Sequence, residues 1–164
     1  MNAESDDSAQ RAFDAAVHVV RVDHSSVRDA GRGFVRAVEA LGPSGLGPNG
    51  VALVRAYDDF ARQLAHTFHE LEEEIVDRVQ VLHAQHRMAP GILARVFPRF
   101  VELERQLAAH GQQLDALSAQ FSEVPPTLVF PLAVFIEAVR TCLRAHRESL
   151  LPALAPFVEG LAHA

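Results

Sequence analysis

The chain has 164 residues, of which 49% are hydrophobic and 22% charged, and its formal net charge is −6. This composition is typical of one globular domain and excludes a disordered chain, and the acidic balance without a basic stretch argues against a nucleic-acid partner. No apolar run approaches the roughly 18 residues that a membrane span needs, and the single cysteine, Cys142, excludes an internal disulfide, so we expect a cytoplasmic protein with no membrane partner.

Four helical segments are predicted in chain order after an acidic, polar start. Residues 1–9 are predicted to be a flexible tail. Three stretches rich in Gly and Pro then separate segments with helical periodicity, at roughly 10–41, 50–87, 91–121 and 127–158. Because short connections favour antiparallel neighbours, the sequence predicts an all-α fold, an antiparallel up-down-up-down four-helix bundle that forms a single domain over residues 10–160.

Three of these segments carry a histidine among their apolar residues. At about 100° per residue, His24, His110 and His146 fall on the inward stripes of the first, third and fourth segments. One buried histidine is usually a hydrogen-bonded core residue, and a ring without partners costs about 1–3 kcal/mol. With a rise of about 1.5 Å per residue, the three histidines and His69 can share one level of the bundle. A shared metal ion would satisfy several rings, so we predict a metal site.

The second segment adds an acidic cluster, residues 66–74. His69 lies near the edge of the apolar stripe, and Glu73 follows four residues later, so the two side chains can present an imidazole and a carboxylate to one ion. Helical periodicity instead places Glu72 nearer the stripe than Glu73. The residues alone therefore favour His69 with Glu72 as the pair of metal ligands.

Four short motifs follow one another along residues 15–155. They are Val22–Arg28 around His24, His69–Glu74, Leu107–Leu114 around His110, and His146–Pro152. Their order and spacing resemble the hemerythrin-like, HHE cation-binding family. This resemblance implies a bundle that holds a non-haem iron pair and binds or senses oxygen, or handles peroxide or nitric oxide. The ligands implied by the resemblance are His24, His69, Glu73, His110 and His146.

The fourth motif departs from the family pattern. Leu150 and Leu151 stand four and five residues after His146, where the family has a carboxylate, and Glu148 falls on the outward face. The third segment also has one histidine rather than two. A mononuclear site, a histidine-rich site for another metal and a site that has lost its metal are therefore alternatives to an iron pair.

A function of a different class also fits the pattern. A metal-free helical bundle can serve as an interaction module, or it can bind an apolar ligand to which the inward histidines hydrogen-bond. Cys142, one turn before His146, is either close to a metal or a small core residue. No nucleophile elbow or phosphate loop is present, so the sequence leaves open whether the protein is an enzyme.

Overall fold

The computed structural model describes residues 3–71, 76–77, 90–119 and 124–154. The elements in chain order are α1 (Ala3–Glu70), α3 (Pro90–Ser118), α4 (Pro126–Ala145) and a short π-helix, η3 (His146–Leu150). No strand occurs within these described ranges. The predicted all-α class is therefore confirmed.

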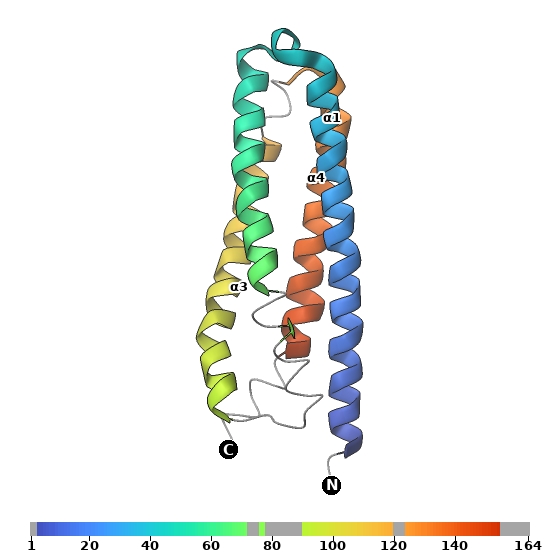
Figure 1. The fold of residues 1–164 in the computed structure, drawn as a ribbon, viewed down its shortest axis with the longest axis vertical. Coiled ribbons are helices and arrows are strands. Elements are labelled where there is room, and N and C mark those ends of the chain that lie inside the picture. Colours follow the sequence, from blue (N-terminus) through green and yellow to red (C-terminus); the bar gives the residue numbers. More distant parts are fainter. Residues whose placement is uncertain (1–2, 72–75, 78–89, 120–123, 155–164) are drawn as a thin grey trace.

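The helix α1 reverses direction at the predicted Gly/Pro break. Gly42 (φ 67°, ψ 171°) and Gly47 (φ 66°, ψ 175°) leave the helical conformation, and each precedes a proline. A positive φ strains any residue with a Cβ, so glycine suits both positions. The residues before Gly42 and after Gly47 thus form two limbs of α1, which run side by side in Figure 1 as the blue and green parts of the ribbon.

The start of α1 differs from the prediction. The helix begins at Ala3, inside the residues predicted to be a tail, and Ala9 packs against a buried apolar cluster. That cluster joins the early turns of the first limb to the end of η3 and the turn after it, through Phe13, Val17, Leu150 and Leu154. A polar composition does not distinguish a tail from the exposed turns of a helix, whose stability comes from the face that packs.

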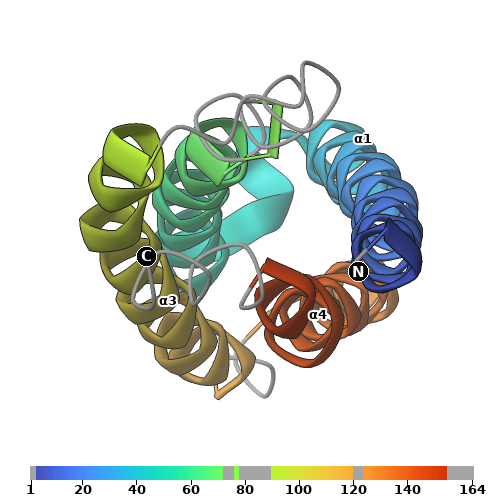
Figure 2. The same ribbon diagram turned by 90° about the horizontal axis from the view of Figure 1, so that it is seen from below.

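A second, larger apolar cluster joins both limbs of α1 to α3 and α4. Its fully buried members include Phe34, Leu114, Leu132 and Phe135. The helix α1 packs more extensively against α4 than against any other element. Seen from below, the two limbs, α3 and α4 surround a common axis (Figure 2). The core therefore follows the stripes that the helical periodicity predicts.

The last helical stretch is the most apolar part of the described chain. By length and composition the segment Pro126–Leu154 could cross a membrane, with a mean hydropathy of 1.5 in its most apolar window. Charged residues such as Glu137, Arg140 and Arg144 interrupt this segment, so it contains no unbroken apolar run of that length. A buried core helix of a soluble protein meets the same criterion, and α4 buries Leu132, Phe135 and Val139 while it exposes Phe130.

Candidate metal centre

The three inward histidines are buried, as the periodicity predicts. The exposed fractions are 6% for His24, 5% for His110 and 0% for His146. His24 comes from the first limb of α1, His110 from α3, and His146 from the point where α4 continues into η3. The three rings do not form one group, however. The structure pairs His24 with His146 and gives His110 other partners.

The rings of His24 and His146 meet through their Nε2 atoms, which lie 3.1 Å apart. Nδ1 of His146 lies 2.7 Å from the backbone carbonyl of Cys142. Because a carbonyl only accepts, Nδ1 of His146 carries the proton and its Nε2 presents a lone pair. His24 therefore donates from Nε2 to Nε2 of His146. The Cys142 carbonyl thus sets the tautomer of His146 and makes His24 the donor in the hydrogen bond between the two rings.

The backbone around His146 is unusual. The π-helix η3 starts at His146, and the N–H of Leu151 donates to the His146 carbonyl, five residues earlier. A π turn inserts an extra residue into an α-helix and changes which residues face inward after it. Such turns occur frequently at functional sites. Helical periodicity in the sequence gave no sign of this turn.

Phe68, from the second limb of α1, covers the histidine pair. Its ring centroid lies 4.0 Å from that of His24 at an interplanar angle of 15°, and 5.0 Å from that of His146 at 9°. Burial, followed by the nearby charges of Arg28 and Arg21, lowers the pKa of His24 from 6.5 to about 4. His24 is therefore neutral at neutral pH, with a nitrogen lone pair in a water-poor setting.

Cys142 is the third potential ligand near this pair. Ring nitrogens of His24 and His146 and the Cys142 sulfur lie within 4.8 Å of one another, and all three side chains are buried. The sulfur, however, approaches Nδ1 of His146 at 3.7 Å, whereas His24 meets Nε2. The two Nε2 atoms are therefore the tightest potential donor set, and Cys142 would have to turn to join them.

The spacing of the two Nε2 atoms is compatible with one bound ion. Ligand nitrogens at about 2.0–2.1 Å from an ion stand about 2.8–3.4 Å apart when their angle at the ion lies between the octahedral and tetrahedral values. The observed 3.1 Å falls inside this range and inside that of an N–H···N hydrogen bond. The pair can hold a metal only if the shared proton leaves and the two lone pairs turn toward one point.

His110 is held by a separate set of polar groups. The Gln113 amide donates to Gln63 at 3.2 Å, so its Oε1 faces Nδ1 of His110 at 3.1 Å and accepts from it. Nε2 of His110 then accepts from the Thr67 hydroxyl at 2.7 Å. That hydroxyl has one proton, and we place it on this contact rather than the 3.1 Å contact with the Gln63 carbonyl. Both ring nitrogens of His110 are satisfied without an ion.

The acidic cluster on the second limb is described only in part. His69 is exposed and lines the same cavity as His24, while His66 pairs with Glu70 at 3.2 Å on the surface. Glu72 and Glu73 lie outside the described residues. The choice between them as a ligand therefore stays a prediction.

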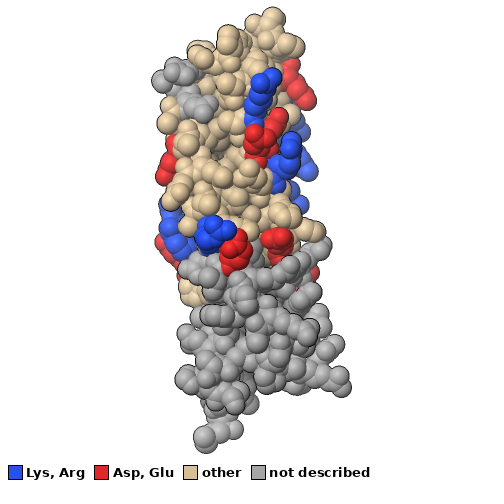
Figure 3. Space-filling model, turned by 90° about the vertical axis from the view of Figure 1, so that its left-hand side faces the viewer, with Lys and Arg blue, Asp and Glu red and all other residues tan. Residues whose placement is uncertain are grey.

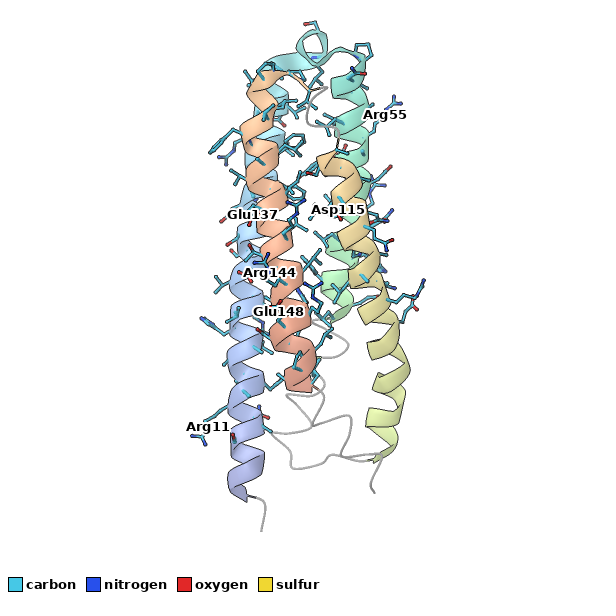
Figure 4. The ribbon with its side chains drawn as sticks, turned by 180° about the vertical axis from the view of Figure 1, so that it is seen from behind. Arg11, Arg55, Asp115, Glu137, Arg144 and Glu148 are labelled. Atoms are coloured by element: carbon cyan, nitrogen blue, oxygen red, sulfur yellow. The ribbon has the colours of Figure 1, made fainter. Side chains whose placement is uncertain are left out.

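The fourth-helix positions agree with the departure noted in the sequence. Leu150 and Leu151 are buried, at 0% and 8% exposure, and Glu148 is exposed. Figure 4 labels Glu148 on the helical stretch that continues α4. No carboxylate from this turn reaches the pair formed by His24 and His146.

No protein-family model, curated protein or solved structure matches this chain. The resemblance to the hemerythrin-like family therefore depends on the four motifs alone and stays a hypothesis.

Proposed function

We propose that this chain is a hemerythrin-like protein that binds a non-haem transition metal, with iron as the expected ion, at the pair formed by His24 and His146. The observation that carries the proposal is the meeting of two buried Nε2 atoms at 3.1 Å, from residues 122 positions apart in the chain. The architecture we propose is an antiparallel up-down-up-down four-helix bundle. Its members would be the two limbs of α1 together with α3 and α4.

The chemistry of the pair supports this assignment. A metal ligand must be a neutral imidazole, and the low pKa of His24 removes competition from protons near neutral pH. Histidine ligands usually donate their second ring N–H to a carbonyl or carboxylate, which fixes the tautomer and orients the ring. The contact from Nδ1 of His146 to the Cys142 carbonyl is of this kind.

Further ligands would come from His69, on the second limb of α1, and from a carboxylate that follows it in the sequence. His69 lines the cavity that reaches His24, and the resemblance implies Glu73, or Glu72 by periodicity, as the carboxylate. Leu150 and Leu151 stand where the hemerythrin-like family has a carboxylate, and both are buried. These residues therefore favour one ion over a pair of ions bridged by carboxylates. Ferrous iron held by His24, His146, His69 and one carboxylate would keep open positions, which could bind oxygen, peroxide or nitric oxide.

A second candidate function is a metal-free bundle that acts as an interaction module or binds an apolar ligand. One observation favours it: the two rings already satisfy each other, and Phe68 stacks on both. In addition, α4 exposes Phe130 at 76% and Val134 at 42%. In this reading the histidines specify how the helices pair and bind no ion.

Metal analysis and the ultraviolet–visible spectrum, measured after anaerobic addition of ferrous iron, distinguish the two functions. We expect His24→Gln and His146→Gln to lose the metal that the wild type retains, because each removes one of two converging donors. His18→Gln is the matched control, since His18 is exposed on the same limb. A wild type without metal, or pair variants that retain it, would exclude the proposed site.

One further variant assigns the role of His110. The structure gives both of its ring nitrogens protein partners, so His110→Gln is expected to keep the metal. The ligand set implied by the resemblance includes His110 and predicts loss instead. The metal content of this variant therefore decides between a site centred on His24 and His146 and the full family set.

A further inference from the structure

A cavity of about 660 Å³ lies between the two limbs of α1 and is partly open to solvent. Its walls are mainly apolar, with Val27, Leu64 and Phe68 from the limbs and Phe135 from α4. This volume is within the range of about 300–1,000 Å³ that is typical of small-molecule sites. We refer to this cavity as the interlimb groove.

One rim of the interlimb groove carries three arginines. Arg28, Arg32 and Arg36 are four residues apart, so they lie on one face of the first limb over about 12 Å, and all three are exposed. Arg32 pairs with Asp29 at 3.6 Å, but both side chains are at least 70% exposed, so the pair contributes little. Among the described residues, neither Arg28 nor Arg36 has a carboxylate within 4.0 Å.

The described lining of the interlimb groove carries basic side chains although the whole chain is acidic. The chain has a net charge of −6, and no acidic side chain is among the described residues that line the groove. Figure 3 shows basic and acidic side chains interspersed over the described part of another face. A lining with three arginines and no acidic side chain, beside apolar walls, is complementary to an anion that carries an apolar body.

The floor of the groove supplies one neutral donor. The Tyr57 ring packs against Phe34 and Phe135, with centroids 4.5 Å and 4.9 Å away. Its hydroxyl lies so close to Gly31 that a Cβ at that position would be 2.7 Å from Oη. Within the described part of the chain this hydroxyl has no hydrogen-bond partner, and it is not sealed from solvent. It can therefore donate to a molecule in the groove.

We propose that the interlimb groove binds a small amphiphilic carboxylate, with the apolar body against Leu64, Phe68 and Phe135 and the carboxylate at Arg28, Arg32 and Arg36. A guanidinium matches a carboxylate with two parallel hydrogen bonds, which favours a carboxylate over a neutral head group. The interlimb groove is the cavity that His24 and His69 also line, but binding of the carboxylate requires no metal ion and so does not depend on the proposed metal function. Binding is expected to persist in the presence of a chelator.

Calorimetric titration with decanoate, below the concentration at which it forms micelles, tests the proposal on the metal-free protein. We expect saturable binding of one molecule. Two methylenes fewer, in octanoate, should weaken binding about fifteenfold, at about fourfold for each buried methylene. The neutral alcohol 1-decanol should bind about tenfold more weakly than decanoate, because it loses the charge-assisted hydrogen bonds.

Arginine variants locate the site. We expect Arg28→Gln and Arg36→Gln each to weaken decanoate binding about fivefold to tenfold. Arg55→Gln is the matched control, because Arg55 is exposed on the second limb and does not line the groove (Figure 4). All three residues are exposed, so the variants are expected to fold, and circular dichroism checks this.

Tyr57→Phe tests independently whether the ligand contacts the floor of the interlimb groove. This change keeps the ring packing and removes only the hydroxyl, so a decrease in decanoate affinity would place the ligand in the groove. Three outcomes would overturn the proposal. They are the absence of saturable binding, equal affinity for decanoate and 1-decanol, and Arg28→Gln and Arg36→Gln variants that bind as tightly as Arg55→Gln.

Discussion

Acid should destabilise this protein through His24 between pH 7 and pH 5. The pKa of His24 is lowered from 6.5 to about 4 by burial and by Arg28 and Arg21. As the pH falls below 6.5, the unfolded chain takes up a proton at this residue while the folded chain does not. The unfolded state then binds more protons, so the free energy of unfolding decreases as the pH falls and the loss is complete near pH 4.

The magnitude follows from the two pKa values. With 6.5 in the unfolded chain and about 4 in the folded protein, the free energy of unfolding should fall by about 2 kcal/mol between pH 7 and pH 5. At a typical urea dependence of about 2 kcal/mol per molar, the unfolding midpoint should move down by about 1 M. Most carboxyl groups titrate below this window, which separates their effect from that of His24.

Urea unfolding followed by circular dichroism at pH 7, 6 and 5, with chelator present, measures this effect. His24→Gln should lose about 2 kcal/mol of the pH dependence, whatever its stability at pH 7. His18→Gln, which removes an exposed histidine from the same limb, is the matched control variant. If His24→Gln and wild type lose stability in parallel between pH 7 and pH 5, the burial argument for His24 is wrong.

Three further predictions concern the packing around the site. Thr67→Val should lower the free energy of unfolding by about 1–3 kcal/mol, because it leaves Nε2 of the buried His110 without its hydrogen-bond donor. The metal content should not change. An unaltered urea midpoint would contradict the predicted loss of stability. Gly42→Ala should lower the free energy of unfolding by about 1 kcal/mol, because φ at this position is +67°. Gly33→Ala should be neutral or slightly stabilising, because nothing lies within 4 Å of the added methyl group. Equal melting temperatures for the two variants would refute the strain at Gly42. Leu150→Ala should lower the free energy of unfolding by about 2–5 kcal/mol, because Leu150 is fully buried. A decrease of less than about 1 kcal/mol, measured by urea unfolding, would show that this turn does not pack as described.

Helical periodicity recovered the all-α class and the burial of three histidines because both depend on local spacing. A residue that falls between apolar neighbours on one helix turns inward whatever its partners are, and His24, His110 and His146 did so. The break at Gly42 and Gly47 could likewise be predicted from the sequence, because glycine next to proline interrupts a helix locally.

The partners of each histidine could not be read in the same way. Whether His24 meets His146 or His110 depends on how far each helix is rotated and shifted against its neighbours, which no single segment encodes. The sequence did not identify Thr67 and Gln113 as partners of His110, because polar residues beside an apolar stripe are common. The π turn at His146 shifts the inward face, so Leu150 and Leu151 are both buried one after the other.

The central claim is that His24 and His146 together bind a metal ion. Its most direct test is the iron content of the wild type and of His146→Gln after anaerobic addition of ferrous iron and removal of the excess. The account predicts about one equivalent in the wild type and its loss in the variant, as expected when one of two converging ligands is removed. Less than about 0.2 equivalents in the wild type, or equal contents in both proteins, would contradict it.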